Sequence, residues 1–558
     1  MRMTKRARVA ASVLALALGA AACGGDDGGS GGGDSGSGFN PDAEVTGGTF
    51  SISINNPENP LLPANTTESE GNQVMSALFT GLVNYNVDTT EVEYTGVAEE
   101  ITSEDNSLWT VKLKDGWTFQ NGEPVDAESF VNAWNYGALS TNAQGGSYFF
   151  SNIVGYDEVQ AETDDEGNIT APPAAQTMSG LKVVDPLTFT VELAEPFAQF
   201  PVTVGYTAFY PLPDAFYEDT EAFGRKPIGN GPFSAATEFV PDEGITLQKF
   251  ADYAGEAEAK ADTVEVRVIS DINTAYAEVQ GNNVDVLDVI PAEAITSAPD
   301  EFGDRFLERE SSSFQYMGFP TYDPRFEDKR VRQAFSMAID REAITETIFN
   351  GTRAPAFSVV SPVVNGSRDD ACEYCKYDPE AAKALLEETG FDTSQNVDLW
   401  FNAGGGHDEW VTAVGNQLRQ NLGINYTLQG QLDFAEYLPK GDAKGFTGPF
   451  RLGWSMDYPS PQNYLEPLYS TSALAPAGSN QTFYSNPEFD DLVSQGNQAE
   501  NDEEAIELYQ QAEDVLLEDM PILPMFFGRV QAVHSENVDN VVVDAFGTIN
   551  LAGITVTS

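Results

Sequence analysis

Signals for β-strands and α-helices alternate along nearly the whole chain, and this feature limits the possible folds more than any other. Three stretches alternate apolar with polar residues as half-buried strands do, at 109–113, 187–193 and 264–268. We find no internal repeat and no heptad run. With 558 residues, the chain is also much longer than one domain of about 100 to 200 residues. We therefore expect an α/β or α+β architecture of two or three domains.

Helix boundaries are marked by capping residues. Asp378-Pro379 begins one predicted helix, with an N-cap and a first-turn proline, and Gly390 ends it. Asp126 caps another that runs through Trp134. A third helix ends before Pro521 and places four apolar residues on one face, namely Ile506, Tyr509, Ala512 and Leu516. Such apolar stripes indicate core packing.

The first residues carry an export signal. Four basic residues precede an apolar run from Val9 to Leu18, and small residues follow. This run is shorter than the roughly 20 apolar residues that a membrane-spanning helix needs. Residues 1–22 are therefore predicted to be a signal peptide, and no second stretch of this kind follows.

Cleavage is expected directly before Cys23. The segment Gly19-Ala20-Ala21-Ala22-Cys23 resembles the lipobox of bacterial lipoproteins, although Ala20 stands where leucine is usual. The resemblance implies that Cys23 receives lipid and anchors the protein, with plain secretory cleavage as the alternative. Residues 23–43 are rich in Gly, Ser and Asp and are predicted to be a flexible linker behind the lipidated cysteine.

The chain is strongly acidic. Its formal charge is −59, and it becomes −63 when the four basic residues before Cys23 are removed, since 24 Lys and Arg then face 87 Asp and Glu. A surface of this sign repels nucleic acid and anionic lipid headgroups. The carboxylates are scattered along the chain, so they indicate a solvated surface and say little about a ligand.

Two cysteines, Cys372 and Cys375, remain after Cys23. Outside the cell membrane such a pair oxidises readily, and its setting looks like a loop, so a structural disulfide is predicted. A zinc site would need two more ligands, and His407 and His534 are distant in sequence. A thioredoxin-like redox motif is the other alternative, and it would normally open a helix after a strand. We expect no metal and no cofactor.

Five segments resemble one protein family and occur in its order. The most specific is Leu113–Phe130, which resembles the signature of the extracellular solute-binding proteins of family 5, the peptide- and nickel-binding proteins of ABC importers. Residues 113–130 also form a plausible local structure, with Asp-Gly and Asn-Gly turns before a capped helix. The other four matching segments are Leu78–Val83, Pro227–Phe233, Val331–Arg341, in which Asp340 caps the second helix, and Gly453–Pro459.

The resemblance implies a fold of the periplasmic-binding-protein type II with an extra subdomain. Two α/β lobes would enclose a ligand in the cleft between them by hinge closure. The expected first lobe comprises 44–80, 206–308 and 528–558, its extra subdomain 81–205, and the second lobe 309–527.

The resemblance also implies ligand contacts in the Gly453–Pro459 segment. Gly453, Trp454 and Ser455 would pair with a peptide backbone, as strand addition does, and Asp457 would meet its ammonium. Asp457 could instead cap the turn before Pro459, and Trp454 could be core. The opposite wall would be Thr67, Glu68 and Ser69, with Tyr316 as a further contact. The sequence departs from the peptide binders at Gly318 and Ser460, where some relatives have acids.

The expected function is capture of oligopeptides or dipeptides on the extracytoplasmic face of the cell membrane and their delivery to an ABC permease. We expect a monomer that does not bind nucleic acid and is not an enzyme. Another solute of the same family is the first alternative: a nickel chelate, haem, an oligosaccharide or a signalling peptide. Direct nickel binding is disfavoured by the presence of only two histidines. A lipid-anchored hydrolase is a remote alternative, because Gly-x-Ser-x-Gly occurs only within the glycine-rich linker, at residues 28–32, and H-E-x-x-H is absent.

Overall fold

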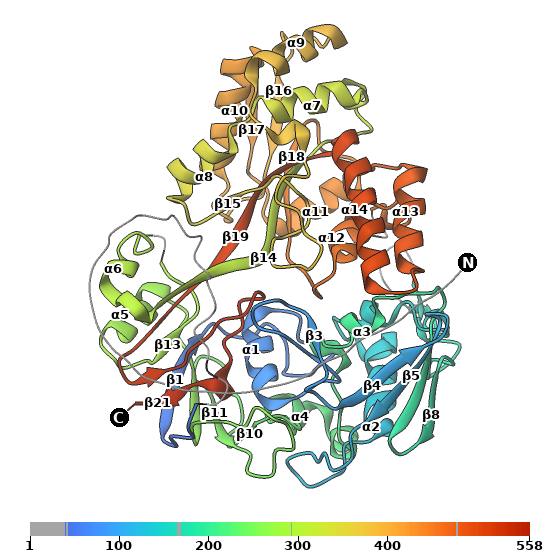
Figure 1. Ribbon diagram of the computed structural model, residues 1–558, viewed down its shortest axis with the longest axis vertical. Coiled ribbons are helices and arrows are strands. Elements are labelled where there is room, and N and C mark those ends of the chain that lie inside the picture. The colour runs from blue at the N-terminus through green and yellow to red at the C-terminus, as the bar shows by residue number, and fades with distance from the viewer. Residues whose placement is uncertain (1–39, 41–42, 164–168, 292, 476–477, 558) are drawn as a thin grey trace, which may run out of the picture. The chain divides into compact units, whose positions relative to one another are not determined.

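The computed structural model describes residues 40, 43–163, 169–291, 293–475 and 478–557 (Figure 1). The predicted signal peptide, Cys23 and most of the predicted linker lie outside the described residues. Within the described residues, no helix is both long enough and apolar enough to cross a membrane.

A large mixed sheet of eleven strands organises the chain. Its order is β10-β11-β12-β1-β13-β19-β14-β18-β16-β17, and β15 pairs with β19. In chain order these strands are β1 Thr49–Ile54, β10 Phe233–Ala235, β11 Gly244–Lys249, β12 Thr263–Val268, β13 Val286–Leu287, β14 Phe306–Gly318, β15 Ala354–Pro355, β16 Val397–Trp400, β17 Tyr426–Gln429, β18 Phe450–Trp454 and β19 Ile522–His534.

Two strands of 13 residues, β14 and β19, connect the two parts of this sheet (Figure 1). They pair antiparallel from Phe306↔Val533 to Gly318↔Ile522. The ladder is interrupted in the middle, where the register shifts between Glu310 and Phe314. Fewer backbone hydrogen bonds hold the strands together at such a shift, so we expect bending to concentrate there.

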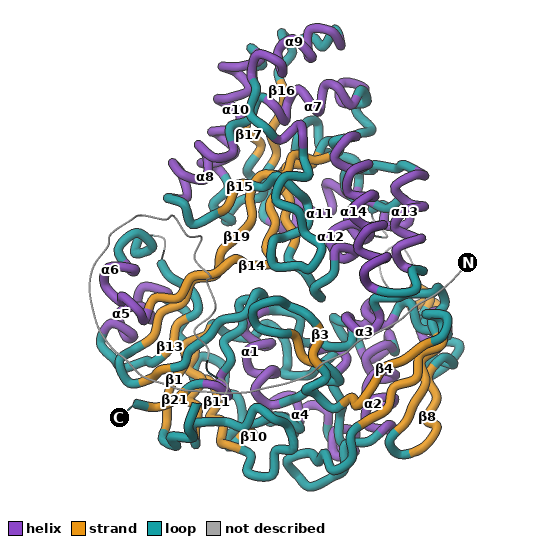
Figure 2. Tube along the Cα trace, viewed as in Figure 1, coloured by secondary structure: helices purple, strands orange, loops and turns teal. Residues whose placement is uncertain are grey.

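A separate antiparallel sheet, in the order β4-β5-β9-β8, lies in the part of the chain before residue 205 (Figure 2). Its strands are β4 Ala98–Ser103, β5 Leu108–Leu113, β8 Leu181–Asp185 and β9 Thr188–Glu192. Three two-stranded ribbons complete the described strands: β2 Asn84–Tyr85 with β3 Val92–Glu93, β6 Glu162–Thr163 with β7 Ile169–Ala171, and β20 Val538–Asp539 with β21 Thr555–Val556.

The helices are α1 Ser69–Leu78, α2 Ala127–Ala138, α3 Phe200–Thr203, α4 Thr220–Arg225, α5 Ile272–Gln280, α6 Ala298–Phe302, α7 Lys329–Met337, α8 Arg341–Phe349, α9 Pro379–Thr389, α10 Asp408–Leu422, α11 Phe434–Asp442, α12 Pro461–Tyr469, α13 Pro487–Asn497 and α14 Asp502–Asp519. The predicted caps are confirmed. Asp126, Asp340 and Asp378 accept the backbone N–H groups that they were expected to cap. Gly390 ends α9 in the left-handed region at φ +72°, which glycine adopts without a Cβ clash.

The apolar side chains form two large cores. One contains the four-stranded sheet, β1, β11 and β12 together with the C-terminal residues, and the second contains β14, β18 and most helices after residue 320. Trp134 of α2 is fully buried in the first core and packs edge-on against Phe189 and Phe209. Tyr509, Ala512 and Leu516 of α14 are buried in the second core, as their spacing predicts.

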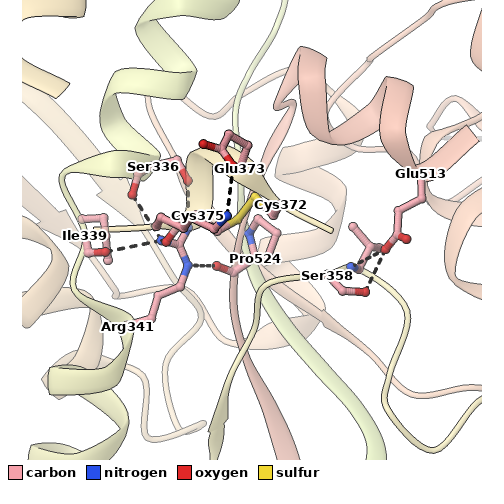
Figure 3. Close-up of a disulfide and its surroundings, with 11 residues drawn as sticks. Ser336, Ile339, Arg341, Ser358, Cys372, Glu373, Cys375, Glu513 and Pro524 are labelled. Carbon is pink, nitrogen blue, oxygen red and sulfur yellow. Dashed lines mark hydrogen bonds and ion pairs between the residues drawn. A yellow bond between two sulfur atoms is a disulfide. The ribbon is translucent and has the colours of Figure 1, made fainter. Parts of the chain in front are cut away.

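The structure pairs Cys372 with Cys375 in a buried disulfide, with their Cα atoms 5.3 Å apart (Figure 3). This loop adjoins the guanidinium of Arg341, which donates to the Cys375 carbonyl over 2.8 Å. Nearby, the buried carboxyl of Glu513 accepts from Ser358 Oγ over 2.8 Å and pairs with Arg368. These contacts join the disulfide loop, α8 and α14 to the second core.

Candidate ligand-binding cavity

A cavity of about 460 Å³ opens beside Asp457. One wall comes from residues 148–209, outside the strands of the four-stranded sheet, and the other from residues 457–497 of the second core. Its volume lies within the range of about 300 to 1,000 Å³ that is usual for small-molecule sites. Asp457 is thus the predicted site residue that the structure places directly in a cavity wall.

Asp457 lies in the short loop between β18 and α12. Its backbone N–H donates to Asn463 Oδ1 over 2.9 Å, and Asn463 Nδ2 donates to its carboxylate over 3.2 Å. The N-cap of α12 is Ser460, which accepts from the Gln462 N–H. Ser460 thus provides the cap at Pro461, and the other carboxylate oxygen of Asp457 has no side-chain donor among the described residues.

The charge of Asp457 is uncompensated. Among the described residues it makes no ion pair within 4 Å, and burial raises the pKa of its carboxyl to about 6, against the opposing effect of the Asn463 hydrogen bond. Burial raises the pKa of Tyr206 to about 12, and the negative charge of Asp457 adds to that rise. Tyr148 shows the same two causes. A buried carboxylate without a cation is costly, and a cationic ligand would remove that cost.

Trp454 is half-buried and holds Asn463 in place. Its indole Nε1 donates to Asn463 Oδ1 over 3.1 Å, and Asn463 in turn contacts Asp457. The side chain also packs against the second core. Trp454 therefore packs against the second core and also positions Asn463, which contacts Asp457.

The edge of β18 is open beyond Phe450. On one side Gly453 pairs with Gln315 and Trp454 with Phe314 of β14. On the other side, within the described part of the chain, β16 pairs with β18 only at Phe450. A Cβ on Gly453 would lie 2.4 Å from Gln315 Nε2, so a larger residue there would require the Gln315 side chain to move. The unpaired edge at 453–455 is a backbone surface onto which an extended peptide could add.

Thr67, Glu68 and Ser69 stand at the start of α1 and do not line the cavity beside Asp457. Thr67 and Ser69 are exposed, whereas Glu68 is half-buried, with Oε1 enclosed and without a hydrogen-bond partner. Burial raises the pKa of Glu68. Its negative charge also adds to the rise in the pKa of Tyr206.

Tyr316 lies in the second core rather than at the cavity. Its side chain is 2% exposed, stacks with Phe314 at a centroid distance of 5.5 Å and meets Tyr469 edge-on. The departure at Gly318 has a steric reason, because a Cβ there would lie 2.5 Å from the Phe450 ring. An acidic side chain has no room at position 318.

Sequence reasoning missed Arg451, three residues before the end of β18. Its guanidinium donates to Gln315 Oε1 over 3.0 Å and to Asn402 Oδ1 over 3.1 Å, and it has no ion pair in the described structure. Burial lowers its pKa, and burial together with the Arg451 charge lowers the pKa of His407 to about 4. A basic residue two positions before Gly453 is unusual in so acidic a chain, and the sequence alone could have drawn attention to Arg451. One short segment thus carries an unpaired base and an unpaired acid.

Three hydrogen bonds near the cavity link the part of the chain before residue 200 to the segment from the end of α13 to the start of α14. The Ala198 N–H donates to the Asn497 carbonyl over 2.7 Å, and Asn106 Nδ2 donates to the Ala499 carbonyl over 2.6 Å. Gln199 Nε2 donates to Asp502 over 2.9 Å. Asn497 also lines the cavity, so the Ala198–Asn497 bond lies beside it.

Comparison with known proteins places this architecture in a family. The model of the bacterial extracellular solute-binding proteins, family 5, matches residues 94–475. The oligopeptide-binding protein OppA of Bacillus subtilis is 26% identical over 518 residues, which cover 90% of this chain and 91% of that protein. The match extends far beyond the five segments that first indicated the family.

Solved structures share the fold. The murein tripeptide binding protein MppA of Escherichia coli matches with a TM-score of 0.71 and 23% identity, covering 92% of this chain and all of that one. OppA of Haemophilus influenzae, solved with the peptide RPPGFSPFR, matches with a TM-score of 0.68 and 20% identity over 92% of this chain and 99% of that one. The predicted two-lobed α/β fold is confirmed. The chain belongs to the bacterial extracellular solute-binding proteins of family 5.

Proposed function

We propose that this protein is the extracytoplasmic substrate-binding protein of an ABC importer, which captures oligopeptides or dipeptides in its cavity and delivers them to the permease. The names of its relatives support this reading, because OppA of Bacillus subtilis is an oligopeptide-binding protein and DppE of the same organism a dipeptide-binding protein. The members of the family are binding proteins, and we propose likewise that this chain is a monomeric binder and not an enzyme.

The observation that carries the proposal is the uncompensated carboxylate of Asp457 in the cavity wall. A free peptide offers an ammonium, a backbone with alternating donors and acceptors, and a carboxylate. Asp457 suits the ammonium, and the open edge at Gly453–Ser455 suits the backbone. Thr67, Glu68 and Ser69 remain proposed as contacts from the opposite lobe, and the domain boundaries remain those predicted from the sequence.

The pH dependence of binding tests the proposal. The peptide ammonium needs an ionised Asp457, whose pKa is about 6 in the free protein. At about pH 7.5 nearly all of this carboxyl is ionised and at about pH 5 roughly a tenth is, so affinity for a tripeptide should fall about tenfold between them. Isothermal titration calorimetry measures this change.

The contribution of Asp457 to the folding stability of the free protein should change in the opposite direction and become more favourable as the pH falls. Because the folded-state pKa lies above the ordinary value of 3.8, folding disfavours the ionised form, and this group's penalty disappears as the pH falls from about 6 to about 4.

In Asp457→Asn the tenfold fall in affinity should be absent. Equal affinity at both pH values in the wild type, or no binding of any peptide by protein freed of retained ligand, would contradict the proposal.

We also propose that Cys23 is lipidated and holds the protein at the outer face of the cell membrane. Cys23→Ala should release the protein from the membrane fraction into the medium or periplasm, because one thioether-linked lipid group is the only anchor expected. Fractionation followed by immunoblotting measures this release. A variant that stays with the membrane as the wild type does would show that the anchor lies elsewhere.

A further inference from the structure

The cavity contains a second carboxyl group, Glu466 of α12, which the ammonium site at Asp457 does not use. Its Oε2 accepts from Gln462 Nε2 over 2.5 Å and from Asn497 Nδ2 over 2.9 Å. Both partners are neutral amides. Among the described residues Glu466 makes no ion pair, so Asp457 and Glu466 both lie in the cavity wall without a counter-charge.

Aromatic side chains form the facing wall. Tyr148 lines the cavity with 53% of its surface exposed, and Phe149, Phe197 and Phe200 lie beside it. Phe149 stacks on Tyr148 at a centroid distance of 4.3 Å and meets Tyr206 at 4.5 Å, so these rings are held in place. The described residues that line the cavity include no Lys, Arg or His, and a third acid, Glu195, is exposed at the rim.

This combination suits a cationic side chain on an apolar stem. The methylene groups of lysine or arginine pack on aromatic faces, the charge gains from cation–π attraction, and a carboxylate in a water-poor site binds the charge strongly. A neutral apolar side chain would fill the same space but would leave Glu466 without a counter-charge.

Resting on the proposed peptide-binding function, we propose that this cavity selects peptides whose first residue carries a cationic side chain. The α-ammonium is held by Asp457, and the lysine ammonium or arginine guanidinium of the same residue is held by Glu466 between α12 and the Tyr148–Phe149 wall. Gln462 and Asn497 orient the Glu466 carboxyl through its Oε2, which leaves Oε1 for the ligand. A glutamine at 466 could accept the same two bonds, so the structural network alone does not require an acid.

The test compares peptides of equal size. Lys-Ala-Ala, norleucine-Ala-Ala and Ala-Ala-Lys are titrated into the full chain, freed of retained ligand, by calorimetry. Norleucine has the lysine stem without its charge, and Ala-Ala-Lys has the same net charge as Lys-Ala-Ala with the base at the other end. The wild type should bind Lys-Ala-Ala at least about tenfold more tightly than either.

Glu466→Gln should abolish this preference while changing the affinity for norleucine-Ala-Ala less than about threefold. Glu507→Gln, which removes one charge from the exposed face of α14, serves as the matched control and should keep the preference. Unfolding curves of the three proteins verify that each is folded.

The outcomes separate two kinds of failure. If all three peptides bind with equal affinity, or if the preference survives in Glu466→Gln, the selectivity is refuted and the peptide-binding function stands. If none of the three peptides binds, the proposed function itself fails. Asp457→Asn should weaken Lys-Ala-Ala and norleucine-Ala-Ala by similar factors, because both present the same α-ammonium.

Discussion

Asp457→Asn is expected to weaken peptide binding by about 30-fold to several thousand-fold. Asparagine has nearly the shape of aspartate, so the contacts with Asn463 can persist, but the ligand ammonium loses its counter-charge in the cavity. Truncating one partner of a buried charge pair costs roughly 2 to 5 kcal/mol, and each 1.4 kcal/mol or so is a tenfold change in affinity. Calorimetry with a free tripeptide measures the loss.

A double-mutant cycle assigns this loss to the ammonium. N-terminal acetylation of the peptide should cost the wild type about as much as the mutation does, and acetylation should cost Asp457→Asn little more, because both changes remove one interaction. Asp491→Asn, an exposed position of α13, controls for the change in net charge and should bind like the wild type. Equal affinity of the wild type for free and acetylated peptide would exclude an ammonium at Asp457.

Local signals predicted the elements of this fold well. The strands at 109–113, 187–193 and 264–268 appear as β5, β9 and β12, because alternation along a strand depends on which face is buried. The turns in the 113–130 segment also appear, with Gly116 at φ +92° and Gly122 at φ +86°. A cap or a tight turn is determined by a few neighbouring residues, so a single sequence displays it.

The cavity could be predicted only in part. Asp457 was found through a motif, but the aromatic wall at 148–209 lies about 250 to 300 residues earlier in the chain, and no local pattern pairs the two. Tyr316 is the converse case. It shares the buried face of β14 with Phe314, two residues away, a strand pattern that favours a core position over a ligand contact. Arg451 was overlooked because its significance depends on the absence of a nearby acid in three dimensions.

Arg341 supports a second strong prediction, because it is a buried cation that forms no ion pair with any described residue. Its side chain is 2% exposed and donates to the carbonyls of Pro524 over 2.5 Å and Cys375 over 2.8 Å, and to Ser336 Oγ over 2.8 Å (Figure 3). Burial lowers the pKa of its guanidinium to about 9. The side chain thereby joins the start of α8, β19 and the disulfide loop.

Arg341→Met should lower the free energy of unfolding of the second lobe by about 3 to 5 kcal/mol. Methionine fills much of the volume but leaves the carbonyls of Cys375 and Pro524 buried without donors, and each orphaned group costs about 1 to 3 kcal/mol. Arg330→Met is the control. That arginine is about half exposed on α7 and pairs with Asp328, so its loss should leave the stability close to that of the wild type.

Arg341→Lys separates charge from geometry at this site. Lysine keeps the positive charge but has three donors at one atom, whereas the guanidinium spreads five over a planar fork that reaches acceptors on different elements. If the fork matters, Arg341→Lys should lose most of what Arg341→Met loses, and urea denaturation with the disulfide intact measures both. If burial of a positive charge were itself the stabilising feature, lysine would restore wild-type stability. Because this charge has no anion among the described residues and its burial lowers the pKa, we expect no such restoration.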